Sequence, residues 1–116
     1  MRFGFLAVVA ASAALATGAM AQDMSALFGN TINMTHADGS VTKLHFQAGG
    51  TYDFVTASGV TGGGTWVVKG DQFCTTRTAP APQPEMCRPS MDRHVGDKWD
   101  EDTPSGKVSY ELVSGQ

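Results

Sequence analysis

The sequence predicts an all-β protein, a small antiparallel β-barrel of lipocalin-like or sandwich-like form with roughly seven or eight short strands. From residue 30 onward, apolar and polar side chains alternate with a period of two, as in strands that have one solvated face. Turns that contain glycine interrupt these runs at intervals of roughly 8–12 residues. The apolar positions are rich in aromatic residues, which suit the interior of a small barrel.

The first half of the barrel lies between clear turn signals. A helical turn over residues 23–29 is expected to place Leu27 and Phe28 over an open end of the β structure. The glycines at 62–64 are expected to form a bulge or tight bend in front of Trp66. The strands predicted for this half cover residues 30–35, 40–47, 51–56, 65–69 and 72–76.

The second half of the chain departs from this regular pattern. Residues 77–84 carry three prolines at alternate positions, which cannot donate to a β-ladder and favour an extended, solvated excursion. A turn then leads into a strand in which Trp99 faces inward. Residues 100–106 are predicted to be a polar loop, and residues 107–113 to be the last strand.

One face of these strands supplies the expected core, with Trp66 as its central ring. Because aromatic side chains bury on the order of 150–250 Å² each, the interior is expected to be filled, with a shallow mouth instead of a large empty calyx. The inward set consists of Ile32, Met34, Leu44, Phe46, Tyr52, Phe54, Trp66, Val68, Phe73, Trp99, Val108, Tyr110 and Leu112.

The first 21 residues are predicted to be a secretory signal peptide. Arg2 precedes a short apolar run, and the sequence Ala19-Met20-Ala21 forms a small-residue cleavage site. The apolar run is shorter than the roughly 20 residues that cross a bilayer. We therefore expect cleavage after Ala21 and a single β domain over residues 22–116, located in the periplasm or secreted.

The charge balance disfavours two classes of partner. The whole chain has 8 Lys and Arg against 11 Asp and Glu, and loss of Arg2 changes its net charge from −3 to −4. An acidic domain without a basic cluster is not suited to nucleic acid or to an anionic membrane surface. The mature chain also contains no segment that is long and apolar enough to span a membrane.

The two cysteines, Cys74 and Cys87, are predicted to form a disulfide bond. Both lie in the exported part, where an oxidising environment favours pairing. A redox or metal-binding pair would be expected at a closer spacing such as C-x-x-C. The short loop that the disulfide closes corresponds to a stabilisation of roughly 3 kcal/mol.

Candidate chemistry is sparse, and we assign no catalytic residue, no cofactor-binding residue and no metal ligand. His45 and His94 lie apart in the sequence, and neither belongs to a recognisable catalytic motif. The acidic run over residues 97–102 lacks the spacing of a calcium loop. Met86, Met91 and His94 are soft or borderline ligands that would suit copper, but methionines at such a place more commonly cover apolar surface.

The loop between Cys74 and Cys87 offers the best candidates for recognition of a partner. Arg77, Met86, Arg88 and Arg93 lie within it or beside it, and arginine and methionine on a rigid segment are suited to a protein contact. A solvated loop without a special role is the alternative interpretation.

The mature chain resembles small exported bacterial proteins of unknown function. The resemblance rests on Gly29-Asn30-Thr31, Gly50-Thr51-Tyr52, Gly64-Thr65-Trp66, the cysteine pair and Gly96-Asp97-Lys98-Trp99. It implies a β domain and no particular activity. The Gly-Asn start and the Gly-Thr-Tyr strand are also similar to avidin-like barrels, but the tryptophans of that ligand site have no match here.

Taken together, these features favour a non-enzymatic binding or interaction module with a protein or small-molecule partner. Two alternatives remain at this point: an envelope enzyme or enzyme inhibitor that uses an acidic or histidine site, and a metal-binding module. Convergence of His45, His94 and an aspartate on one pocket would favour an enzyme.

Overall fold

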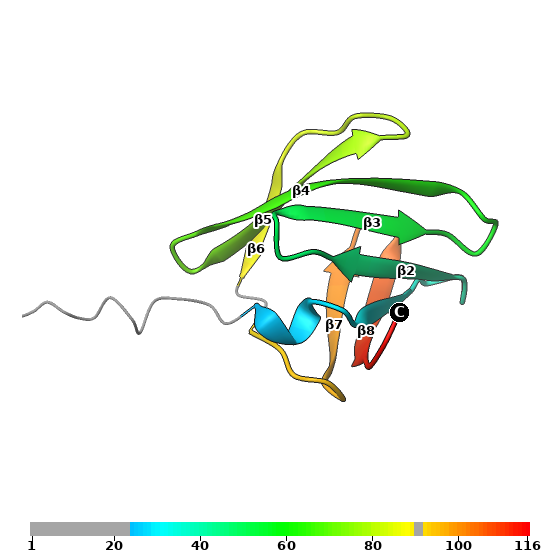
Figure 1. Ribbon diagram of the computed structural model, residues 1–116. Coiled ribbons are helices and arrows are strands. Elements are labelled where there is room, and N and C mark those ends of the chain that lie inside the picture. Colours follow the sequence, from blue (N-terminus) through cyan, green and yellow to red (C-terminus); the bar gives the residue numbers. More distant parts are fainter. Residues whose placement is uncertain (1–23, 90–91) are drawn as a thin grey trace, which may run out of the picture.

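The computed structural model describes residues 24–89 and 92–116 and confirms the all-β prediction. A short 3-10 helix, η2 (Ser25–Leu27), precedes eight strands (Figure 1). These are β1 (Thr31–Thr35), β2 (Val41–Phe46), β3 (Thr51–Val55), β4 (Thr61–Lys69), β5 (Gln72–Ala79), β6 (Met86–Pro89), β7 (Lys98–Thr103) and β8 (Gly106–Val113). The predicted signal peptide lies outside the described residues.

All eight strands belong to one antiparallel sheet that curls into a half-barrel. Consecutive strands from β1 to β6 are neighbours, and β8 returns to pair with β1, which gives the order β6-β5-β4-β3-β2-β1-β8-β7. No ladder joins β6 to β7 in the described part of the chain, so these two are the edge strands. The space between β6 and β7 is called the seam below.

The glycines at 62–64 lie within β4 and allow its neighbours to approach closely. The register between β4 and β5 shifts between Gly63 and Gly64, which confirms the predicted bulge. A Cβ atom on Gly63 would lie 2.3 Å from the Tyr52 carbonyl oxygen, and one on Gly64 would lie 1.9 Å from that of Thr76. Any side chain at these two positions would therefore force the strands apart.

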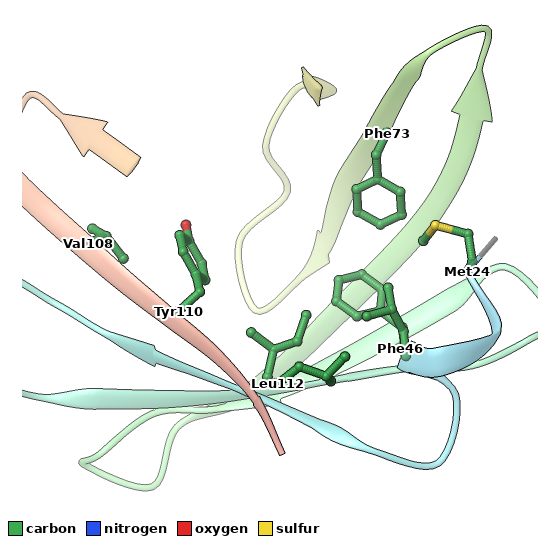
Figure 2. Close-up of a cluster of buried hydrophobic side chains, with 8 residues drawn as sticks. Met24, Phe46, Phe73, Val108, Tyr110 and Leu112 are labelled. Atoms are coloured by element: carbon green, nitrogen blue, oxygen red, sulfur yellow. The ribbon is translucent and has the colours of Figure 1, made fainter. Parts of the chain in front are cut away.

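The packed core occupies one end of the half-barrel, which η2 covers as predicted. Leu27 is buried, and Phe28 forms an isolated bridge with Phe46. Figure 2 shows Met24 next to Phe46 and Phe73, with Tyr110 and Val108 farther along β8. The buried apolar cluster consists of Met24, Leu27, Ile32, Phe46, Phe73, Val108, Tyr110 and Leu112.

Trp66 has a more peripheral place than the sequence predicts. Its side chain is only half-buried, and its indole Nε1 donates a hydrogen bond to the Gln47 carbonyl oxygen at 2.9 Å. Its ring stacks between those of Phe28 and Phe73, with centroid separations of 5.9 and 5.8 Å. Phe73, only 1% exposed, is the ring at the centre of the packed end.

The polar loop predicted over residues 100–106 is wrong. Residues 98–103 form β7, which pairs with β8 from Lys98↔Glu111 to Thr103↔Gly106. The turn is confined to the segment between Thr103 and Gly106. Acidic residues are compatible with a strand here because Asp100 and Asp102 are exposed, whereas Glu101 faces the interior and has polar partners there.

The predicted disulfide bond between Cys74 and Cys87 is confirmed, with an S–S distance of 2.06 Å. The two cysteines lie directly opposite each other in the β5–β6 ladder, so the bond fastens an edge strand of only four residues to the rest of the sheet. Within residues 24–89 and 92–116, no helix is long and apolar enough to cross a membrane.

Candidate functional site

The concave face of the sheet encloses a cavity of about 380 Å³. This volume lies at the lower end of the range of roughly 300–1,000 Å³ that small-molecule sites occupy. The expectation of a filled interior therefore holds only for the end covered by η2. Farther along the half-barrel, side chains line the interior without filling it.

Most of the cavity wall is apolar. Phe46 and Phe73 belong both to the packed core and to the cavity wall, and their rings meet edge to face with centroids 5.4 Å apart. Trp99 and Tyr110 form a second aromatic wall, stacked at a centroid separation of 5.4 Å. The apolar and aromatic lining consists of Ile32, Met34, Leu44, Phe46, Tyr52, Phe54, Phe73, Pro84, Met86, Trp99 and Tyr110.

The mouth of the cavity is polar because of the topology. In an antiparallel meander the odd-numbered strands all run the same way, so the ends of β1, β3, β5 and β7 meet at the end opposite η2. Polar lining residues occur at or just after these ends: His36 follows β1, Thr56 follows β3, Gln83 lies in the β5–β6 loop, and Thr103 ends β7. The His36 Nε2 atom is 2.8 Å from the Thr42 hydroxyl.

A cluster of three polar side chains, Arg88, Glu101 and Tyr110, bridges the seam. The Tyr110 hydroxyl donates a hydrogen bond to Glu101 Oε1 at 2.9 Å. The Arg88 guanidinium lies 3.5 Å from Glu101 Oε2 and donates a long hydrogen bond, also 3.5 Å, to the Tyr110 hydroxyl. Edge strands β6 and β7 are therefore linked by side chains where no backbone ladder joins them.

Burial raises the pKa of Tyr110 above its usual value of 10.0, and the hydrogen bond to Glu101 raises it further. The nearby Arg88 charge acts in the opposite direction. The net effect keeps the phenol protonated, which preserves its hydrogen bond to the Glu101 carboxylate.

Arg77 is the other arginine that lines the cavity. Its Cζ atom lies 4.9 Å from the centroid of the Phe54 ring, a cation–π contact. The Arg77 backbone carbonyl oxygen accepts a hydrogen bond from the Gln83 backbone N–H at 3.1 Å, which connects the proline-rich loop to the end of β5. The side chain thus has a defined place at the cavity wall.

The structure brings together three of the four predicted contact residues. Arg77, Met86 and Arg88 all line the cavity. Arg93 does not line the cavity; its Cζ atom lies 4.2 Å from the Trp99 ring centroid, and its buried Nε atom lacks a hydrogen-bond partner. The sequence analysis placed all four in or beside the loop that the disulfide closes; the structure places Arg77 on β5 and both Met86 and Arg88 on β6, with Met86 still 57% exposed.

The residues considered for catalysis do not converge on this cavity. His45 on β2 pairs with Asp53 on β3 at 3.0 Å, whereas His94 lies 3.8 Å from Asp97 in the turn before β7. Neither histidine lines the cavity. Asp38 lies in the β1–β2 turn, where hydrogen bonds from the Ser40 side chain and amide hold its pKa below the usual value.

The metal-binding alternatives also find little geometric support. In the described part of the chain, Cys74, Glu85 and Cys87 form the one group of three ligand-type side chains whose ligand atoms lie close together. Both sulfur atoms belong to the disulfide, and Glu85 pairs with Lys69 at 2.9 Å. Met91, part of the copper alternative, lies outside the described residues, and the acidic residues of the calcium alternative fall mainly on β7.

Sequence reasoning missed Glu101 as a site residue. The signal that identifies it is the alternation over residues 98–103, in which Trp99, Glu101 and Thr103 share one face. A glutamate on the same face as an inward tryptophan points to a polar partner inside the barrel. Tyr110 is a neighbour of Glu101 through the β7–β8 ladder, whereas Arg88 lies on the opposite edge strand and reaches Glu101 only because the sheet curls.

Comparison with protein-family models, with curated proteins and with solved structures finds no match to this chain.

Proposed function

We propose that this protein is a non-enzymatic binding module, periplasmic or secreted, which holds a small molecule with an apolar body inside its half-barrel. The cavity carries the proposal, since it is concave, mostly apolar, and edged by a few polar groups. The signal-peptide pattern of residues 1–21 supports export, and the disulfide is consistent with an oxidising compartment. Residues 22–116 are proposed to act as one domain.

Burial of apolar surface is the expected driving force for binding. The aromatic walls provide contact area, and Thr75 and Gln83, which also line the cavity, supply neutral hydrogen-bonding groups that can fix orientation without adding charge. Because η2 and the packed core close the far end, a ligand enters through the polar mouth.

The test uses N-phenyl-1-naphthylamine, a neutral dye whose fluorescence increases in apolar surroundings. Wild-type protein is expected to bind it with a saturable increase in emission. Leu44→Trp places a large ring in the cavity and is expected to weaken binding at least about tenfold, the loss of roughly 1.4 kcal/mol of contact. Lys43→Trp, on the exposed face of the same strand, is the matched control and is expected to bind as the wild type does.

Two outcomes would contradict the proposal. One is the absence of saturable binding by the folded wild-type protein, and the other is an equal loss for both tryptophan variants. Circular dichroism of each variant establishes that the β fold is intact before binding is compared.

A further inference from the structure

The charges inside the cavity are not balanced. Its charged lining residues are Arg77, Arg88 and Glu101, together with the titratable His36. Arg88 and Glu101 lie within 3.5 Å of each other, so their charges compensate. Among residues 24–89 and 92–116, no carboxylate forms a salt bridge with Arg77. One guanidinium therefore remains without a counter-charge in a mostly apolar site.

We propose that Arg77 is an anion-binding residue and that the ligand is a small monoanionic molecule with an apolar body. This inference rests on the proposed function. The anionic group, a carboxylate or a sulfonate, would meet Arg77 at the end of β5, while the apolar body extends toward Leu44 and Phe46. A planar guanidinium presents paired donors to such a group.

The contact of Arg77 with Phe54 supports this role. The ring holds the guanidinium over one face without using its N–H donors, because a cation–π contact acts through the face and hydrogen bonds lie in the plane. Thr75, the preceding inward residue of β5, and Gln83 line the same cavity and supply neutral hydrogen-bonding groups. The donors of Arg77 are thus oriented in advance of binding.

The charge of the whole protein does not explain such a preference. The chain has a net charge of −3 and repels anions at long range. Any preference for an anionic ligand must come from a local positive group, and within the cavity that group is Arg77. The preference is also limited to about one negative charge, since Glu101 already satisfies Arg88.

Two dyes that share one skeleton test the inference. The dye 8-anilinonaphthalene-1-sulfonate is N-phenyl-1-naphthylamine with an added sulfonate group. Wild-type protein is expected to bind the sulfonate at least about tenfold more tightly than the neutral dye, as for a hydrogen-bonded charge pair. Arg77→Gln is expected to abolish this preference, so that the two dyes bind with similar affinity. Arg77→Lys, which keeps the charge, is expected to retain part of the preference.

Lys107→Gln is the matched control, because it removes one positive charge from an exposed position on β8. It is expected to leave the ratio of the two affinities unchanged. Leu44→Trp is expected to weaken both dyes, which establishes that both bind in the cavity.

The outcomes separate this inference from the proposed function. Equal affinity of the wild type for the two dyes, or an equal loss of sulfonate binding in Arg77→Gln and Lys107→Gln, would overturn the role of Arg77 and leave the binding cavity in place. Failure of both dyes to bind would overturn the proposed function itself. If Arg77→Gln does not fold, the wild-type ratio and its response to Arg77→Lys still decide the matter.

Discussion

Replacing both Cys74 and Cys87 by alanine tests how the fold maintains the cavity. Strand β6 has four residues and forms its backbone ladder with β5 alone, yet it carries Met86 and Arg88 into the cavity wall. The disulfide closes a loop with a sequence separation of 13 residues. For a loop of this length, the restriction of the unfolded chain corresponds to about 3 kcal/mol of stability.

The double variant is therefore expected to lose about 3 kcal/mol of unfolding free energy, measured by urea denaturation under conditions that keep the wild-type disulfide intact. A domain of this size has only about 5–15 kcal/mol in total, so the midpoint should fall markedly. Alanine is the appropriate replacement because Cys74 is 1% exposed and a serine hydroxyl would be buried there.

Hydrogen exchange separates the local effect from the global one. The amides of β6 are expected to exchange faster in the double variant, relative to those of central strands β2 and β3, because β6 is held on one side only. Binding of the neutral dye should weaken in parallel as one wall of the cavity becomes mobile. A stability loss below about 1 kcal/mol, or unchanged exchange in β6, would refute the reasoning that the disulfide fixes this wall.

Two further predictions concern the core and the seam. Phe73→Ala is expected to lower the free energy of unfolding, measured by urea denaturation, by about 3–5 kcal/mol. Trp66→Ala is expected to lower it by about 2 kcal/mol, since Trp66 is half-buried. Val67→Ala, at an exposed position, is the control, and a larger loss of stability for Trp66→Ala than for Phe73→Ala would contradict the core described above. Because the pKa of Tyr110 is higher in the folded state, its contribution to stability is complete below pH 10 and is lost as the pH rises through the raised value. Unfolding free energies measured from pH 9 to 12 should fall less steeply for Tyr110→Phe than for the wild type, and equal slopes would contradict a buried, protonated phenol.

Much of the fold follows from local sequence patterns. Alternation identifies the faces of the strands, so that every side chain predicted to face inward is buried or packs against the core or lines the cavity. The cysteine pair predicts its own disulfide, and the short helical turn predicts that Leu27 covers one end. These features depend either on residues that are close in sequence or, for the disulfide, on the fact that two cysteines can pair in only one way.

The cavity could not be predicted in the same way because it depends on residues that are small or polar and face inward. Thr75 is the inward residue between Phe73 and Arg77 on β5. Thr42, Glu101 and Thr103 also line the cavity. Counting the aromatic residues overestimates how well the interior is filled, since it ignores these positions. The rings of Phe28, Phe46, Trp66 and Phe73 also gather at one end instead of being spread along the barrel.

The seam explains why the two arginines of the cavity have different roles. Strand β6 is short and ends at Pro89, which has no N–H group to donate to a ladder. Arg88 makes the contact from β6 to β7 through its ion pair with Glu101, and this pair neutralises the charge of Arg88. Arg77 lies on β5, where the ladder with β4 already holds the strand, so its charge is not needed to close the sheet. Removal of Glu101 alone would free Arg88 as a second anion-binding group, and Glu101→Gln is therefore expected to tighten binding of the sulfonate dye but not of the neutral dye.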